Sequence, residues 1–284
     1  MRQRLFAFLL VPVVFFSCTT NNVTVDNSLQ KYFDSAGVRG TFGLYDNGQG
    51  HFTIYNLARF RDSAYAPGET FDVLLGLVAL QTGVASNENS LIVKSYVYFE
   101  GDSAAAMARV RSRDTSAAAG EYSLKDIFKG LEGSIGTYML TTVLGKDTLK
   151  KWVDSLHYGN RDISGIVDSG RIEGRLKITA DEQMGLTKKL YFDQLPFFQR
   201  PQQIVRSLFR TERNSNYLLA YKTGSWVKDG KTLGWIVGWE EENKHPYFFV
   251  LNFEANAPNL DVPTVGLQLV KKCLTPMGFF AGKK

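Results

Sequence analysis

The sequence contains few residues of the kinds that bind metal ions or build disulfide scaffolds. Of its 284 residues only two are cysteines, Cys18 and Cys273, and three are histidines. Two cysteines cannot form a disulfide-dense scaffold, and the dispersed His51, His157 and His245 provide little material for a histidine-rich zinc site. The sequence therefore predicts no metal and no other cofactor.

Long apolar runs are also scarce, and the most informative one lies at the N-terminus. The run Leu5–Phe16 follows Arg2 and Arg4. It is shorter than the roughly 20 residues that cross a bilayer core, but it has the length of the apolar part of a signal peptide. We therefore expect residues 1–17 to be a signal peptide and the protein to be exported to the periplasmic or cell-surface side.

Cys18 stands directly after this segment and before the polar residues 19–22. The arrangement resembles the lipobox of bacterial lipoproteins, in which the cysteine becomes the acylated first residue of the mature protein. This resemblance implies that residues 18–39 comprise a lipid-anchor cysteine and a polar tether. Acyl chains on Cys18 would bind a membrane, each buried CH₂ contributing about 0.8 kcal/mol. The alternative is an ordinary cleaved signal peptide followed by an incidental cysteine.

Neither basic nor acidic residues are concentrated in one part of the sequence. Without residues 1–17 the chain has 31 basic and 28 acidic residues, and its lysines and arginines are dispersed. Nucleic-acid binding requires a basic surface with aromatic residues that stack on bases, so the sequence predicts no nucleic-acid partner. The content of 44% hydrophobic residues is near the globular average and excludes a disordered or collagenous protein.

The first part of the chain has the periodicity of strands and then becomes helical. Alternation over residues 40–45 and 51–57, on either side of the turn sequence Asp46-Asn47-Gly48, predicts a β-hairpin. The apolar run 73–81 stops at Gly83, which predicts a buried helix with a C-terminal glycine cap.

Two segments in the middle of the chain have helical signals. Apolar residues recur at helical intervals over 123–156, with breaks near 130–136 and at Gly145. Thr179 and Glu182 have the spacing of a capping box, which predicts a helix start there.

The last part returns to strands and ends in a helix. Residues 217–226, 231–240 and 247–253 read as three consecutive strands, and residues 265–274 as an amphipathic helix. Strands at both ends of a helical block predict an α+β domain over residues 40–284. In it, N- and C-terminal strands share one antiparallel sheet and the middle region is all-helical.

A set of short motifs is distributed along this domain. In chain order they are Phe42-Gly43-Leu44-Tyr45-Asp46, the segment 67–72, the segment 77–83, Tyr158-Gly159-Asn160, Lys222-Thr223-Gly224 and the segment 234–239. In this order and spacing, the set resembles class D β-lactamases and penicillin-binding serine transpeptidases. The resemblance implies the β-lactamase/transpeptidase-like fold and a β-lactam-like or peptidoglycan-like small ligand. It places five residues in the ligand cleft: Lys222, Thr223, Gly224, Ser225 and Asn160.

The chain departs from this family at the positions of the catalytic residues. The family uses a serine at the start of the buried helix and a lysine one turn later, which removes the serine's proton while backbone N–H groups receive the oxyanion. Here the corresponding frame reads Glu69-Thr70-Phe71-Asp72, so Glu69 and Asp72 occupy the positions of the nucleophile and the base. A carboxylate at Glu69 would oppose an oxyanion, so we expect covalent acylation to fail.

Other positions of the family pattern also differ. The second serine falls on Glu132-Gly133-Ser134, or on Ser134-Ile135-Gly136 after a shift of two residues. The tryptophan that shields the family's lysine falls on Arg171, and no arginine follows Arg213 to hold a substrate carboxylate. Ser134, with Lys222 as its base, is the alternative nucleophile that the sequence leaves open.

These observations lead to one main hypothesis and two alternatives. The lysine of Lys-Thr-Gly faces the nucleophile in the family, so we expect Lys222 to form a salt bridge with Glu69 or Asp72. The main hypothesis is an exported, lipid-anchored pseudoenzyme that binds cell-wall or β-lactam-like ligands non-covalently. The alternatives are an active β-lactamase or peptidase with a relocated nucleophile, and an envelope protein-interaction module.

Overall fold

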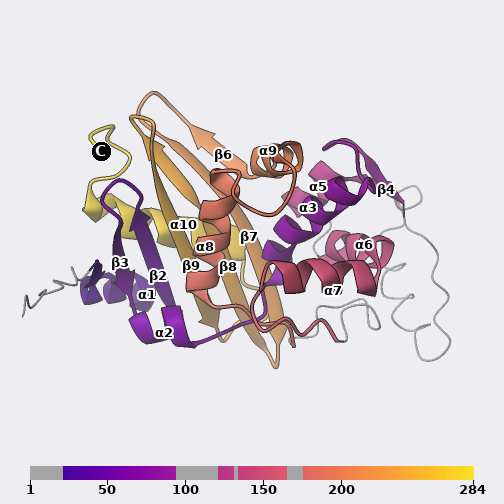
Figure 1. Cartoon of the computed structure of the whole chain (residues 1–284). Helices are drawn as coiled ribbons and strands as arrows, with labels where there is room; N and C mark the ends of the chain where they lie inside the picture. The colour runs from indigo at the N-terminus through magenta and orange to yellow at the C-terminus, as the bar shows by residue number, and fades with distance from the viewer. Residues whose placement is uncertain (1–21, 94–120, 131–133, 165–174) are drawn as a thin grey trace, which may run out of the picture.

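The computed structural model describes residues 22–93, 121–130, 134–164 and 175–284 (Figure 1). Its main feature is a seven-stranded sheet with the strand order β1-β3-β2-β9-β8-β7-β6. The strands are β1 (Val23–Val25), β2 (Arg39–Asp46), β3 (His51–Tyr55), β6 (Arg210–Arg213), β7 (Leu218–Lys228), β8 (Lys231–Glu242) and β9 (His245–Ala255). Because β2 pairs antiparallel with β9, N- and C-terminal strands share one sheet, which confirms the predicted α+β class.

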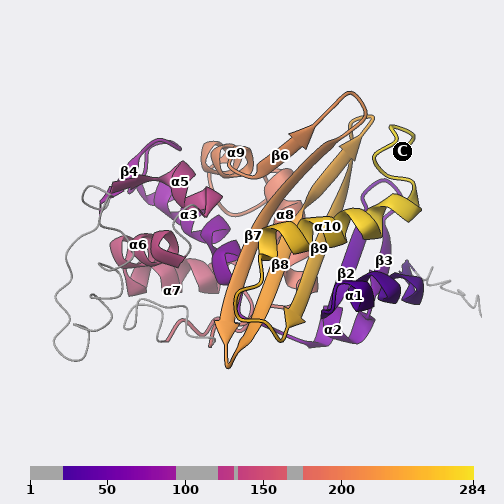
Figure 2. The ribbon, with the colours of Figure 1, turned by 180° about the vertical axis from the view of Figure 1, so that it is seen from behind.

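Helices cover both faces of this sheet and form a separate group to one side of it (Figures 1 and 2). One face carries α8 (Ala180–Tyr191), and the other carries α10 (Val262–Leu274) with α1 (Gln30–Ser35). The lateral group contains α3 (Asp72–Thr82), α5 (Leu124–Lys129), α6 (Ser134–Leu144), α7 (Lys146–Ser155) and α9 (Gln199–Ser207). The remaining elements are α2 (Leu57–Asp62), β4 (Leu91–Val93), β5 (Glu121–Ser123), and the short 3₁₀ helices η1 (Asn27–Leu29), η2 (Gly68–Phe71) and η3 (Thr275–Met277).

Local sequence signals explain where the helices next to the site begin and end. Thr179 and Glu182 form the predicted capping box at the start of α8, where each side chain binds the other residue's backbone N–H. Helix α3 ends at Gly83, whose φ of +79° belongs to the left-handed region that favours glycine. Its residues from Asp72 to Ala79 are all buried, as the uniformly apolar sequence predicts.

The sheet separates two hydrophobic cores. Phe248 is fully buried in the core beneath α8 and α3, whereas the adjacent Phe249 is fully buried in the core beneath α10. Successive strand residues point to opposite faces, so the central strands β8 and β9 must be apolar on both sides. Each fully buried phenylalanine contributes about 1.5–3 kcal/mol. The aromatic residues of these strands are therefore core residues.

The segment before residue 40 differs from the polar tether that the sequence predicted. Residues 23–25 form β1, which pairs in parallel with β3, and α1 follows within the same segment. Leu29 and Phe33 are each only 1% exposed and pack beneath α10. These two residues are four apart and so share one helical face, which makes the segment part of the folded domain. Residues 18–21, including Cys18, lie outside the described residues.

None of the helices in the described ranges is long and apolar enough to cross a bilayer.

Candidate functional site

The site predicted from the sequence lies where η2 and the start of α3 contact strand β7. The contact is close because both sides carry glycine. A Cβ on Gly68 would lie 2.3 Å from the backbone oxygen of Ser225, and a Cβ on Gly224 would lie 2.6 Å from the backbone nitrogen of Thr70. Gly68 also has a φ of +54°, a backbone conformation that residues with a Cβ atom rarely adopt. These glycines let the strand reach the helix head directly.

Glu69 projects from η2 onto this strand. Its Oε2 atom accepts a hydrogen bond from the backbone N–H of Ser225, with an N–O distance of 2.5 Å, and one from the Ser225 hydroxyl at 3.2 Å. Burial raises the pKa of the Glu69 carboxyl and the negative charge of Asp72 adds to this, while the Ser225 N–H and the charge of Lys222 lower it. The backbone N–H of Ser225 on β7, which faces the helix head, is thus already bound to a carboxylate of the protein itself.

Asp72 and Lys222 form a buried ion pair one turn further along. The Lys222 Nζ atom lies 3.0 Å from Asp72 Oδ2, and the two side chains are 4% and 1% exposed. This confirms the salt bridge predicted for Lys222. Thr137 donates to the other carboxylate oxygen at 2.6 Å, and Nζ also donates to the carbonyl of Phe128 at 2.8 Å. Burial raises the pKa of the Asp72 carboxyl, against the opposing effects of Lys222 and Thr137.

Thr70 at the helix head has a structural role, and the other predicted residues, Thr223 and Ser134, lie on neighbouring elements. The Thr70 hydroxyl donates to the carbonyl of Pro67 at 2.6 Å and accepts from Gln183 Nε2 at 2.7 Å, so it is buried and fully bonded. Thr223 is half-buried on β7. Ser134 is the first residue of α6, one helical turn before Thr137, which places its backbone near this site. The side chain of Ser134 lies outside the described part of the structure.

The Tyr-Gly-Asn loop is fixed by its own hydrogen bonds. Asn160 donates to the carbonyl of Arg175 at 2.7 Å and accepts from the N–H of Lys177 at 3.1 Å. Tyr158 is buried and contacts the ring of Phe71 edge-on, with the centroids 5.4 Å apart. Burial also raises the pKa of the Tyr158 hydroxyl. Asn160 therefore holds two chain segments together, and the ligand contact that the resemblance implies for it stays a prediction.

Several residues that the sequence analysis singled out are not among the residues that the structure describes. Arg171, Glu132 and Gly133 lie outside the described residues, as does the lipidation candidate Cys18. The site residues that sequence reasoning missed are Thr137, Gln183 and the carbonyl of Phe128. A polar Thr137 within the otherwise apolar start of α6 was the one signal available, because a buried hydroxyl needs a partner.

The site is a hydrogen-bonded cluster of two carboxyl groups and one ammonium group, in which Lys222 pairs with Asp72 and Ser225 donates to Glu69. Acyl transfer through a serine, the chemistry that the resemblance implies, needs a hydroxyl beside a free base. In the described part of the site, the only amine is Lys222, and it is paired with a carboxylate. Within the same ranges no group of three or more His, Cys, Asp or Glu residues could hold a metal ion.

Comparison with known proteins places this site in a family. The model of the penicillin binding protein transpeptidase domain matches residues 21–265. The chain therefore belongs to the penicillin-binding protein transpeptidase domain family, and it is similar to class D β-lactamases in both sequence and structure.

Individual relatives support this assignment. The chain is 29% identical over 258 residues to beta-lactamase OXA-48 of Klebsiella pneumoniae, covering 90% of this chain and 88% of that protein. It is 27% identical to the regulatory protein BlaR1 of Bacillus licheniformis, covering 85% of this chain but only 38% of BlaR1. The crystal structure of the class D β-lactamase YbXI from Nostoc superposes with a TM-score of 0.73 at 26% identity, covering 89% of this chain and 99% of that one.

Proposed function

We propose that this protein is an exported penicillin-recognising homologue that does not form a covalent acyl-enzyme. The observation that carries this proposal is the pair of carboxylates at the head of α3. Glu69 binds the Ser225 N–H, and Asp72 binds Lys222. In the family these positions hold the nucleophile and the base, so neither an attacking hydroxyl nor a free amine is available there.

Electrostatics also disfavour acylation at this helix head. An acyl-transfer transition state develops negative charge that backbone N–H donors must stabilise. The Ser225 N–H already donates to Glu69, so an incoming oxyanion would compete with a fixed carboxylate and be repelled by it. Removing one such donor costs about 2.7–4 kcal/mol of transition-state stabilisation in a serine protease. A ligand of this cleft would thus be held without a covalent bond.

Incubation with a fluorescent penicillin tests the proposal. We expect no fluorescent band on a denaturing gel, because the helix head lacks a nucleophile. OXA-48, assayed in parallel, provides the positive control for labelling. A covalent adduct on this protein would overturn the proposal. Peptide mapping would then name the nucleophile, and an adduct at Ser134 would favour the active enzyme with a relocated serine.

Lipid anchoring through Cys18 is the second part of the proposal. Growth of an expressing bacterium with labelled palmitate should label the protein, and Cys18→Ser should abolish the label and release the protein from the membrane fraction. Cys273→Ala is the matched control, because Cys273 is buried in the α10 core and inaccessible to acylation. Label that persists in Cys18→Ser contradicts the anchor, and its loss in Cys273→Ala points to a general defect in export.

A further inference from the structure

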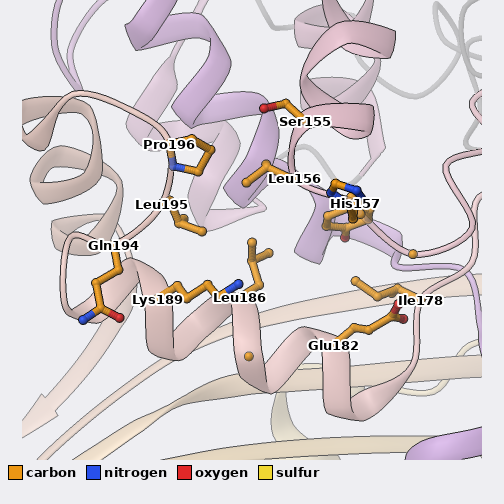
Figure 3. Close-up of a pocket in the computed structure, with 13 residues that line it drawn as sticks. Ser155, Leu156, His157, Ile178, Glu182, Leu186, Lys189, Gln194, Leu195 and Pro196 are labelled. Atoms are coloured by element: carbon orange, nitrogen blue, oxygen red, sulfur yellow. The ribbon is translucent and has the colours of Figure 1, made fainter.

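A groove of about 420 Å³ lies between α8 and the segment that follows α7 (Figure 3). Leu156 and Leu195 line one wall, and Leu186 lines the α8 side. The groove shares no residue with the Glu69, Asp72 and Lys222 cluster. Its size falls within the roughly 300–1,000 Å³ range of small-ligand sites, and its apolar walls with a few polar groups fit their usual composition.

Gly185 lies on the groove side of α8 with open space before it. A Cβ at this position would meet no atom within 4 Å, so packing does not require glycine here. Glycine in the middle of a helix is less stable than alanine. A glycine that local packing does not explain leaves the helix backbone accessible to something lying in the groove.

Two charged residues flank Gly185 along the same face of α8. Glu182 lies three residues before it and Lys189 four residues after it, and both line the groove. Seven residues of helix correspond to about 10.5 Å between the two positions. Glu182 Oε2 binds the N–H and hydroxyl of Thr179, which leaves Oε1 available. Lys189 forms no ion pair within the part of the chain that the structure describes, and its side chain extends along α8 toward Leu186 (Figure 3).

We propose that this groove binds a short extended peptide of two or three residues. Its amino group lies at Glu182, its carboxylate at Lys189, and a side chain lies over Gly185 between Leu156 and Leu186. Three extended residues span about 10 Å, which matches the rise of about 10.5 Å along α8 between positions 182 and 189. The proposal concerns a different site from the penicillin-recognising cleft and stands independently of it.

Titration of the ¹⁵N-labelled protein with tri-L-alanine tests the proposal by NMR. We expect saturable shifts of the Gly185 and Lys189 backbone amides. Lys189→Gln and Glu182→Gln should each weaken binding about 10-fold, and Gln at position 182 still satisfies the capping box. Gly185→Leu should abolish binding by filling the groove, whereas Gly185→Ala, the matched control, adds one methyl group and should weaken it less.

Three results would overturn the assignment. The first is the absence of saturable shifts with tri-L-alanine. The second is binding that Gly185→Leu leaves unchanged while the variant remains folded by circular dichroism. The third is binding of hexanoate as tight as that of tri-L-alanine, together with no effect of Glu182→Gln, because such a site would recognise an anion alone. N-acetyl-trialanine amide, which lacks both charges, should not bind.

Discussion

Replacing Lys222 by methionine is expected to destabilise the protein by about 3–5 kcal/mol. The reason is that Asp72 is 1% exposed and would remain as a buried charge without a counter-charge, with the Thr137 hydroxyl as its remaining donor. The carbonyl of Phe128 would lose its donor as well. Chemical denaturation of wild type and Lys222→Met, followed by circular dichroism, measures the difference in the free energy of unfolding.

Two further variants make this result interpretable. The double variant Asp72→Asn/Lys222→Met removes both charges, so it should be at least about 1 kcal/mol more stable than Lys222→Met alone. Lys271→Met breaks the pair with Glu212, whose side chains are 38% and 32% exposed, and should cost less than about 1 kcal/mol. If Lys222→Met costs no more than Lys271→Met, the Asp72–Lys222 pair does not form.

A second large effect concerns pH and arises from Glu240 on β8. This residue is 0% exposed, and neither carboxylate oxygen has a hydrogen-bond partner in the described structure. Burial raises the pKa of Glu240 from 4.5 to about 9, and the neighbouring charges of Glu242 and Glu241 add to the increase. The folded protein therefore keeps this proton between pH 4.5 and 9, while the unfolded chain loses it.

The sign of the pH dependence follows from this difference in bound protons. Where the folded state holds more protons, the free energy of unfolding falls as pH rises. Stability from Glu240 is thus complete below pH 4.5 and is lost progressively up to about pH 9, by at most about 1.4 kcal/mol per pH unit. Denaturant unfolding at pH 5, 7 and 9 should show this decrease.

Glu240→Gln should reduce the decrease, because glutamine does not titrate. Glu212→Gln, on the edge strand β6, is the matched control and should leave the pH dependence nearly unchanged. An unchanged slope in Glu240→Gln would show that this carboxyl is ionised, and therefore solvated, in the folded protein.

Much of the fold could be predicted because its signals are local. The hairpin around Asp46-Asn47-Gly48, the buried helix ending at Gly83 and the capping box at Thr179 depend on residues close together in the sequence. Periodicity also predicted the two central strands β8 and β9, which the structure buries on both faces. Helix α9 and edge strand β6 were missed, since both segments are rich in polar residues and β6 spans only four residues.

The candidate site was only partly predictable. The salt bridge of Lys222 followed from the family resemblance, in which the lysine of Lys-Thr-Gly faces the nucleophile, and the structure selects Asp72 over Glu69 as its partner. The bond from Ser225 to Glu69 and the Thr137 contact depend on how β7 and α6 approach α3, which no local pattern encodes. The prediction of a polar tether before residue 40 failed for a similar reason, because β1 forms by pairing with the distant strand β3.

The early start of the fold at β1 limits how far an anchored form could extend. Only residues 19–22 separate Cys18 from Val23, and five residue steps span at most about 18 Å when fully extended. With lipid on Cys18, the edge of the sheet formed by β1 and β3 would remain within about 18 Å of the bilayer surface. Such a protein would bind ligands only close to its own membrane, and any ligand would have to reach that layer by diffusion.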